Sequence, residues 1–289
     1  MLLNASGCLD ALTAPETARM FAAFVTKTVT PLPRGGNEPV RIAETDVGML
    51  NSIGLANPGR DAFVAETLPR LRELDLPLWV SVGGFAAQEY GETCALLEDV
   101  TIELNLSCPN VDEAPESVAE IVAASRAATG LPLYAKLSPA TWDIAEVARA
   151  VEAAGADGLS LVNTIRGVAL DARLRPQLTR GAGGYSGPAL KPIALAAVHA
   201  CFRATELPIV GMGGVSTGRD ALDLFAAGAS AVALGTVLFS DPSAPVRIRE
   251  ELDAELATHG LSSADEACGI AHENALPRRK HLDVESRVS

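Results

Sequence analysis

The sequence predicts an α/β fold in which eight parallel strands, each followed by a helix, close into a (β/α)8 TIM barrel. Apolar, strand-like runs alternate with amphipathic, helix-like periods along the chain. The fully apolar runs among them are typical of a parallel sheet buried on both faces. Eight such runs occur, the number that this barrel requires. A doubly wound open sheet is the alternative, since periodicity alone does not exclude it.

Each expected element rests on its own local pattern. Helices are expected over 143–154 and 191–204, where apolar residues recur at helical spacing. Gly155 and Gly228 follow Ala-Ala pairs just before a strand, where a helix C-cap favours a positive φ. The more polar segment 260–289 predicts a terminal helix followed by a tail. Strands are expected over residues 2–5, 24–28, 78–82, 100–104, 131–137, 158–162, 208–211 and 231–234.

Composition restricts the possible functions. No break in composition divides the 289 residues, so one barrel domain over 1–289 is expected. The net charge of −13 argues against nucleic acid as the main partner. Five cysteines without a CxxC pair and four histidines without metal spacing predict neither a disulfide framework nor a metal site. A signal peptide and a membrane-spanning run are both absent, which predicts a cytoplasmic protein.

Every predicted strand is followed by a polar residue or a glycine. Strand ends of a barrel converge on one rim, where active sites lie. We therefore expect these positions to share a site. They are Ser6-Gly7, Lys27-Thr28, Ser81 to Gly83, Asn105 with Cys108, Lys136, Asn163-Thr164, Gly211 to Gly214, and Gly235-Thr236.

Glycines after the last two strands predict a phosphate site. Gly213-Gly214 and Gly235-Thr236 free backbone N–H groups where such barrels bind phosphate. A helix beginning near Ser216 is expected to add its positive end, and Gly187 to add another close backbone approach. Tight turns alone are the alternative reading. Gly-x-Gly-x-x-Gly is not met, because Ser216 holds the sixth position, so a Rossmann-type dinucleotide site is not supported.

The run 103–110 and two strand lysines carry the remaining chemistry. Within this run, Asn105 and Asn110 offer paired donors and acceptors for a flat heterocycle, and Cys108 offers a thiol. A polar turn around a half-buried cysteine is the alternative. Lys27 and Lys136 predict an anionic partner, such as a phosphate, a carboxylate or a reduced ring. Lysines that merely reach solvent, or a Schiff-base Lys136 in a lyase, are the alternatives.

Together these motifs resemble the class 1 dihydroorotate dehydrogenases, and most closely the class 1B catalytic subunit. The resemblance runs through nearly the whole chain. It rests on Asn4-Ala5-Ser6-Gly7-Cys8, Lys27-Thr28-Val29-Thr30, Gly48-Met49-Leu50-Asn51-Ser52-Ile53-Gly54-Leu55, Asn105-Leu106-Ser107-Cys108-Pro109-Asn110, Ala135-Lys136-Leu137-Ser138-Pro139, Asn163-Thr164, Ser186-Gly187-Pro188 and Gly211-Met212-Gly213-Gly214-Val215.

The resemblance implies an FMN enzyme of pyrimidine biosynthesis that oxidises dihydroorotate to orotate. It implies that Cys108 is the general base, taking the C5 proton while a hydride passes to the flavin. The implied FMN contacts are Ser6, Lys27, Thr28, Asn105, Lys136, Val162, Gly187, Gly213, Gly214, Gly235 and Thr236. The implied substrate contacts are Lys27, Asn51, Ser52, Ile53, Gly54, Leu55, Asn105, Asn163 and Thr164.

The resemblance also implies a separate FAD and iron–sulfur subunit, and a homodimer or a heterotetramer with that subunit. The chain departs from the family pattern in the short segment 111–115 after Asn110, in Ser81 where Asn is common, and in its short start before Asn4. An FMN barrel acting on another dihydropyrimidine, or a non-catalytic flavin- or pyrimidine-binding barrel, remains as an alternative.

Overall fold

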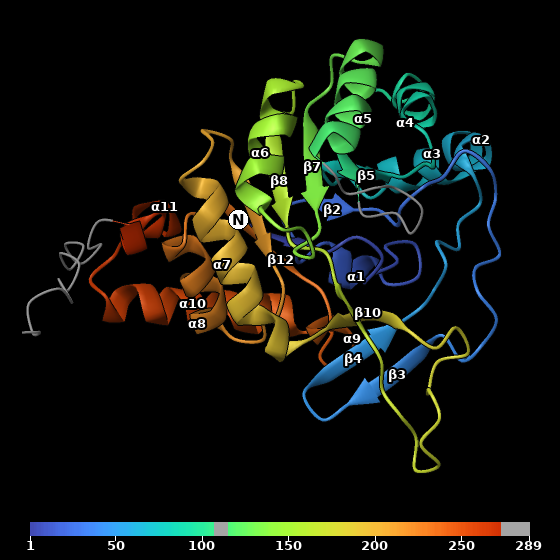
Figure 1. Ribbon diagram of the computed structural model, residues 1–289. Coiled ribbons are helices and arrows are strands. Elements are labelled where there is room, and N and C mark those ends of the chain that lie inside the picture. Colours follow the sequence, from blue (N-terminus) through green and yellow to red (C-terminus); the bar gives the residue numbers. More distant parts are fainter. Residues whose placement is uncertain (107–114, 273–289) are drawn as a thin grey trace, which may run out of the picture.

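The computed structural model describes residues 1–106 and 115–272 and contains a barrel of eight parallel strands (Figure 1). Around it the strands follow the order β1-β12-β11-β8-β7-β6-β5-β2. A parallel bridge between Leu3 and Ala23 joins the two ends of that order. All eight predicted strands are therefore confirmed. They are β1 (Leu2–Asn4), β2 (Phe24–Val25), β5 (Leu78–Val82), β6 (Thr101–Asn105), β7 (Leu133–Leu137), β8 (Gly158–Leu161), β11 (Ile209–Met212) and β12 (Ala231–Leu234).

Strand β2 is shorter than expected. Its pairing with β5 covers Phe24 and Val25, lapses at Lys27, and resumes as a single bridge at Val29. An interruption of this kind breaks the strict alternation of side chains between the two faces of a sheet. It explains how the consecutive residues Lys27 and Thr28 both line the same cavity.

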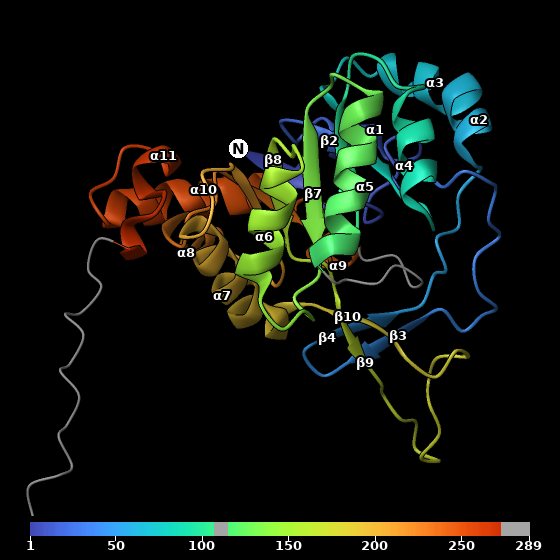
Figure 2. The same cartoon turned by 45° about the horizontal axis from the view of Figure 1, so that its top comes forward.

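Helices cover the outside of the barrel (Figures 1 and 2). The predicted helix over 143–154 is confirmed as α6, whose N-cap Asp143 accepts hydrogen bonds from the N–H groups of Ala145 and Glu146. Gly155 and Gly228 follow helices with φ of 101° and 117°, as expected. The helices are α1 (Pro15–Ala18), α2 (Arg60–Ala62), α3 (Leu68–Arg72), α4 (Ala87–Cys94), α5 (Pro115–Ala128), α6 (Ile144–Ala153), α7 (Lys191–Phe202), α8 (Gly218–Ala226), α9 (Val237–Ser240), α10 (Ala244–Thr258) and α11 (Ala264–Ala267).

The described chain also contains a π-helical turn, Phe63–Thr67, and two 3-10 turns, Pro188–Leu190 and Ile270–His272. The expected terminal helix corresponds to the short α11, and the expected tail from residue 273 lies outside the described residues. Among the residues that the structure describes, no helix is both long and apolar enough to cross a membrane.

A small antiparallel sheet stands beside the barrel and was not predicted (Figure 2). Its order is β3 (Ile42–Thr45), β4 (Gly48–Asn51), β10 (Gly183–Ser186) and β9 (Ile165–Gly167), so it joins two distant segments of the chain. The two segments cross closely, since a Cβ on Gly48 would lie 2.2 Å from the Ser186 carbonyl oxygen. This sheet places the segment after β4, residues 51–55, against the mouth of the barrel.

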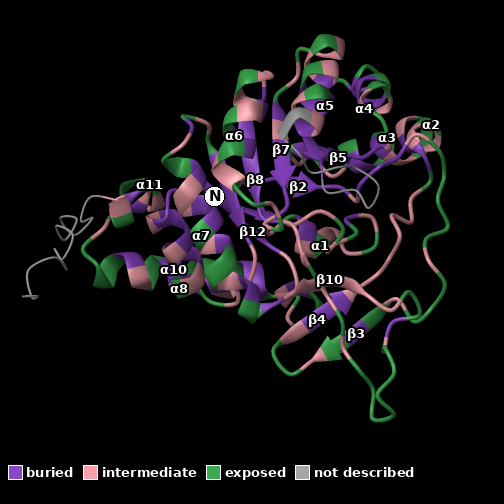
Figure 3. Ribbon diagram, viewed as in Figure 1, coloured by how far each residue is buried: buried purple, intermediate pink, exposed green. Residues whose placement is uncertain are grey.

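The buried core of the barrel divides into two layers. Figure 3 shows that buried residues concentrate on the barrel strands and exposed residues on the surrounding helices and loops. Alternate strand residues such as Ile102, Leu104 and Leu159 belong to the large cluster between barrel and helices. A second cluster of strand side chains, which includes Trp79 and Val210, fills the inside of the barrel. Among the strand side chains that point into the barrel, polar residues replace apolar ones nearer the carboxyl ends of the strands. These fully or nearly fully buried residues are Ser81, Glu103, Lys136 and Ser160.

Candidate active site

One cavity of about 690 Å³ opens at the carboxyl ends of the barrel strands. Every predicted contact residue in the described chain lines it. The predicted cofactor contacts in its wall are Ser6, Lys27, Thr28, Asn105, Lys136, Val162, Gly187, Gly213, Gly214, Gly235 and Thr236. The predicted substrate contacts in its wall are Lys27, Asn51, Ser52, Ile53, Gly54, Leu55, Asn105, Asn163 and Thr164. The predicted base Cys108, and Asn110 with the segment that follows it, lie outside the described residues.

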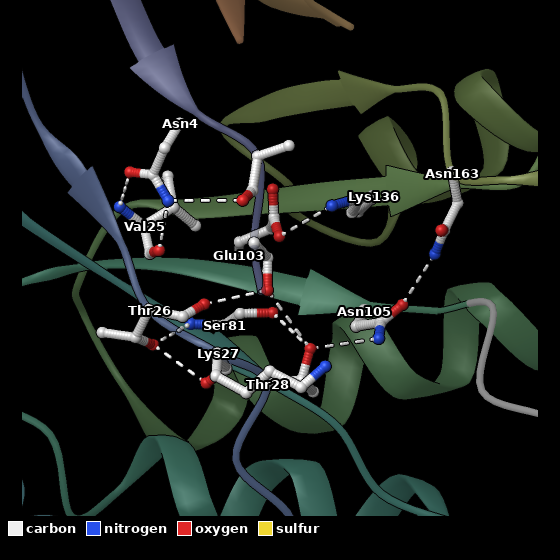
Figure 4. A network of polar contacts seen from close by, with 12 residues as sticks. Asn4, Val25, Thr26, Lys27, Thr28, Ser81, Glu103, Asn105, Lys136 and Asn163 are labelled. Atoms are coloured by element: carbon white, nitrogen blue, oxygen red, sulfur yellow. Dashed lines mark hydrogen bonds and ion pairs between the residues drawn. The ribbon is translucent and has the colours of Figure 1, made fainter. Parts of the chain in front are cut away.

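A chain of hydrogen bonds between side chains forms the floor of this cavity (Figure 4). Thr28 Oγ1 lies 3.4 Å from Ser6 Oγ and 3.0 Å from Ser81 Oγ. Asn105 Nδ2 donates to the same Thr28 oxygen across 3.2 Å. Asn163 Nδ2 in turn donates to Asn105 Oδ1 across 3.1 Å. This hydrogen-bond network fixes the orientation of the Asn105 and Asn163 amides, so the floor of the cavity presents defined donors and acceptors.

Ser81 belongs to the support of this floor rather than to its surface. Its side chain is fully buried and does not line the cavity. Besides the bond to Thr28, its backbone N–H donates to Thr26 Oγ1 across 3.1 Å. Ser81, the position that departs from the family pattern, therefore contacts the cavity wall only through Thr28 among the described cavity-lining residues.

Two lysines reach the cavity, and they differ in their partners. Lys136 is only 5% exposed, and its Nζ lies 3.4 Å from the Glu103 carboxylate, so the reading of a solvent-reaching lysine is wrong for Lys136. Lys27 has no ion-pair partner among the described residues. Burial lowers the pKa of the Lys27 ammonium, a potential Cys8 thiolate acts to raise it, and the Lys136 charge lowers it further. An anion in the cavity would relieve this repulsion.

Cys8 lines the cavity but was not singled out as a contact from the sequence. Burial raises the pKa of its thiol, an effect that the Lys136 and Lys27 charges oppose and the Glu103 charge reinforces. The thiol therefore keeps its proton near neutral pH. Its side chain packs beside Gly235, where a Cβ would lie 3.5 Å from Cys8 Sγ.

Glycines form a cradle of unpaired N–H groups on one wall. Gly213 and Gly214 have φ of 121° and 78°, and a Cβ on Gly214 would lie 2.5 Å from the Lys191 backbone nitrogen. Within the described chain, the backbone N–H groups of Gly213, Gly214, Gly235 and Thr236 make no hydrogen bond to protein. Consecutive free N–H groups of this kind bind phosphate oxygens.

Helix α8 begins where the sequence predicts, at Gly218, but its positive end is not available to a ligand. The N–H groups of Ser216 and Thr217 both donate to Asp220 Oδ2 across 2.9 Å. The Gly218 N–H donates to Glu251 Oε2 across 2.7 Å. Two carboxylates of the protein, Asp220 on α8 and Glu251 on α10, therefore already accept from the N–H groups that were expected to face a phosphate.

The segment 51–55 is held in place by Asn37, a residue that no sequence pattern singles out. Asn37 lines the cavity, and its backbone N–H donates to the Ile53 carbonyl across 3.0 Å. Asn37 Nδ2 also donates to the carbonyl and the hydroxyl of Ser52, across 3.0 and 2.9 Å. The segment then turns through Gly54 and Leu55, both with positive φ. Only the folded contact, and no local pattern, identifies Asn37.

The residues present fit the FMN that the family resemblance implies. The volume lies in the range of ligand pockets, roughly 300–1,000 Å³. The glycine cradle suits a phosphate, and a Cβ on Gly187 would lie 2.6 Å from the Gly48 Cα, so this wall has no room for side chains. Polar floor residues and a lysine cation suit a heterocyclic ring that gains negative charge on reduction.

Comparisons with known proteins agree with this geometry. The family model described as dihydroorotate dehydrogenase matches residues 1–256. Dihydroorotate dehydrogenase B (NAD(+)), catalytic subunit, of Desulforudis audaxviator is 44% identical over 262 residues, 86% of this chain and 85% of the relative. The protein of the same name from Geobacillus kaustophilus is 40% identical over 285 residues, 93% of this chain and 90% of the relative.

A solved structure shares the fold. The crystal structure of DHODH from Eimeria tenella in complex with ferulenol superposes with a TM-score of 0.79 at 25% identity, covering 94% of this chain and 85% of that one. Together with the family model and the relatives above, this similarity confirms the predicted barrel and the predicted family. The chain belongs to the dihydroorotate dehydrogenase family, among the class 1B catalytic subunits.

Proposed function

We propose that this chain oxidises dihydroorotate to orotate in pyrimidine biosynthesis with FMN as its cofactor. One observation carries the proposal beyond family membership. Described residues from seven barrel strand ends and from the small sheet, each predicted as a cofactor or substrate contact, line a single cavity with an amide floor and a glycine cradle. The FMN dependence of the family agrees with that arrangement.

Residues of the cradle would hold the FMN phosphate. The free N–H groups of Gly213, Gly214, Gly235 and Thr236 would donate to its oxygens, and the Ser186 hydroxyl, 2.8 Å from Thr236 Oγ1, would support that wall. Thr28, Asn105 and Lys136 would contact the ring. Bound FMN supplies a hydride acceptor, a capacity that no protein side chain has.

Asparagine amides and a loop would orient the substrate. Asn105, Asn163 and Asn51 line the cavity and offer donors and acceptors to the amide-like edges of dihydroorotate. In the described chain, the N–H groups of Ile53, Gly54 and Leu55 make no hydrogen bond to protein. These N–H groups suit the substrate carboxylate, as does the ammonium of Lys27, which has no ion-pair partner in the described part of the chain.

Proton removal is assigned to Cys108, which lies outside the described residues, so its role stays a prediction. Electron transfer to NAD is named for the relatives, each called the catalytic subunit of an NAD(+) enzyme. By analogy we propose a separate FAD and iron–sulfur subunit for this chain, within a homodimer or a heterotetramer. A cytoplasmic location and a single barrel domain over 1–289 stay predictions as well.

Steady-state turnover tests the proposed reaction. FMN-loaded protein, dihydroorotate and an artificial electron-accepting dye should yield orotate, measured by chromatography, in amounts equal to the dye reduced. Dihydrouracil in place of dihydroorotate should react at least about tenfold more slowly, because it lacks the carboxylate that Lys27 and the 53–55 N–H groups would bind. Faster reaction with dihydrouracil would favour another dihydropyrimidine, and bound flavin without turnover would favour a binding protein.

A further inference from the structure

A carboxylate lies inside the barrel, behind the cavity wall. Glu103 is 1% exposed and comes from the middle of β6. It does not line the cavity, whereas its ion-pair partner Lys136 does. Figure 4 shows the two side chains pointing toward each other from adjacent strands, at 3.4 Å between Glu103 Oε1 and Lys136 Nζ. Lys136 therefore stands between this buried carboxylate and any ring bound in the cavity.

Stability alone gives little reason for this arrangement. Taking two charges out of water costs several kcal/mol per ion, and apolar replacements of a buried ion pair are often neutral or stabilising. The surrounding layer would accept an uncharged residue, since Ser81 and Ser160 stand on the neighbouring β5 and β8. The use of a full negative charge at this position needs another explanation.

The net charge of the groups around the cavity supplies an explanation for the carboxylate at position 103. Two ammonium groups, Lys27 and Lys136, line the cavity, and among the described residues one carboxylate, Glu103, forms an ion pair with Lys136. With Glu103 ionised the group carries one net positive charge, and without it two. In a poorly solvated interior, the presence or absence of one full charge strongly changes the free energy of a nearby ring that becomes anionic on reduction.

We propose that Glu103 is a positioning residue that holds the Lys136 ammonium at the cavity wall and, through its negative charge, sets the reduction potential of the bound FMN. This inference rests on FMN occupying the cavity but not on the identity of the substrate. Glu103 keeps the flavin from becoming too strong an electron acceptor, so that reduced flavin can still pass its electrons onward.

Equilibrium reduction of the FMN-loaded protein against a reference dye tests the proposal without any pyrimidine. Glu103→Gln keeps the shape and removes the charge, so the equilibrium constant for two-electron reduction should shift at least tenfold toward reduced flavin, about 30 mV. Glu103→Asp keeps the negative charge but places it farther from Lys136, so this variant should shift the equilibrium constant less than Glu103→Gln does.

The control is Ser160→Ala, which removes a neutral buried hydroxyl in register with Lys136 on the next strand. It should leave the equilibrium constant within twofold of the parent. A role in packing alone predicts the opposite order, with Asp, which leaves a gap, disturbing the flavin more than the isosteric Gln.

Two results would overturn the proposal: a Gln variant within twofold of the parent, or an Asp variant shifted more than the Gln variant. If Glu103→Gln does not fold, Glu103→Asp decides alone, and an unshifted or opposite equilibrium contradicts the role. Failure of dihydroorotate oxidation in the parent protein would refute the proposed function without touching this result, because the dye titration needs only bound FMN.

Discussion

Asn163 on the chain after β8 donates from Nδ2 to Oδ1 of Asn105 at the end of β6, across 3.1 Å. The bond joins two strand ends that are separated by β7 in the barrel. Since Asn105 Nδ2 donates to Thr28, the amide of Asn105 has a fixed orientation. The two amides therefore form one recognition surface rather than two independent contacts.

Replacing Asn163 with Ala should lower kcat/KM for dihydroorotate by about 10- to 100-fold. The substitution removes a substrate amide contact and leaves Asn105 less firmly oriented, a loss of roughly 1–3 kcal/mol. Steady-state kinetics measure it. Gln88→Ala is the control, because this exposed amide on α4 bonds, among the described residues, only to Glu92, and it should change kcat/KM less than twofold. A normal kcat/KM in Asn163→Ala would remove Asn163 from the substrate site.

Replacing Gly214 with Ala should weaken FMN binding by about 100-fold or more. The new Cβ would lie 2.5 Å from the Lys191 backbone nitrogen, so the backbone that forms the cradle would have to move. Flavin fluorescence during titration of the apoprotein measures the Kd. Gly181→Ala is a matched control, since Gly181 has a similar φ of 81° with nothing within 4 Å of the added Cβ. Equal FMN affinity in both variants would mean that the phosphate binds elsewhere.

Asp220 should stabilise the fold in a pH-dependent way. Its burial acts to raise the pKa, but the bond from Lys191 and those from Ser216 and Thr217 outweigh it and lower the pKa from 3.8 to about 2. Because the folded pKa is depressed, the stabilisation is complete above about pH 4 and is lost as the pH falls through about 2. Asp220→Asn should therefore cost about 2 kcal/mol at neutral pH.

Urea unfolding at several pH values measures this effect. The free energies of unfolding of the parent and of Asp220→Asn should converge as the pH falls toward about 2. Asp61→Asn provides the comparison, because its side chain is 92% exposed, and it should change the free energy by less than about 0.5 kcal/mol at any pH. A constant difference between the parent and Asp220→Asn down to acid pH would contradict the assignment.

Replacing Cys108 with Ala should slow flavin reduction by about 100-fold or more, because the proton acceptor is lost. A free thiol has a pKa near 8.5, so the parent rate should rise toward alkaline pH. Cys8→Ala should retain this rise, since burial raises the pKa of the Cys8 thiol and keeps it protonated. If Cys108→Ala keeps the parent rate in stopped-flow experiments, another residue is the base.

Much of the barrel could be predicted because its signals are local. Apolar runs and glycine caps fix all eight strands and the ends of α6 and α8 without tertiary information. The small sheet was not predicted because β4 and β10 contain glycines and polar residues and so lack an apolar strand pattern. These strands are stabilised by pairing with each other across a large separation in the sequence. Its effect on the site, the placement of residues 51–55, is a tertiary consequence.

The site residues could be anticipated from strand ends and from the resemblance, but their partners could not. The ion pair between Glu103 and Lys136 forms because both side chains point into the barrel at neighbouring positions of β6 and β7. Predicting it would require the register between these two strands. The use of the α8 N–H groups by Asp220 likewise depends on side-chain geometry. Asn37 lies in a loop without periodicity, so nothing in the sequence marks it.

Anaerobic mixing of the FMN-loaded protein with dihydroorotate tests whether the chain oxidises this substrate. Flavin absorbance should bleach in a single turnover, with one orotate formed per flavin, and dihydrouracil should bleach it at least about tenfold more slowly. A yellow protein whose flavin stays oxidised in excess dihydroorotate, yet is reduced normally by a chemical reductant, would refute dihydroorotate oxidation by this chain.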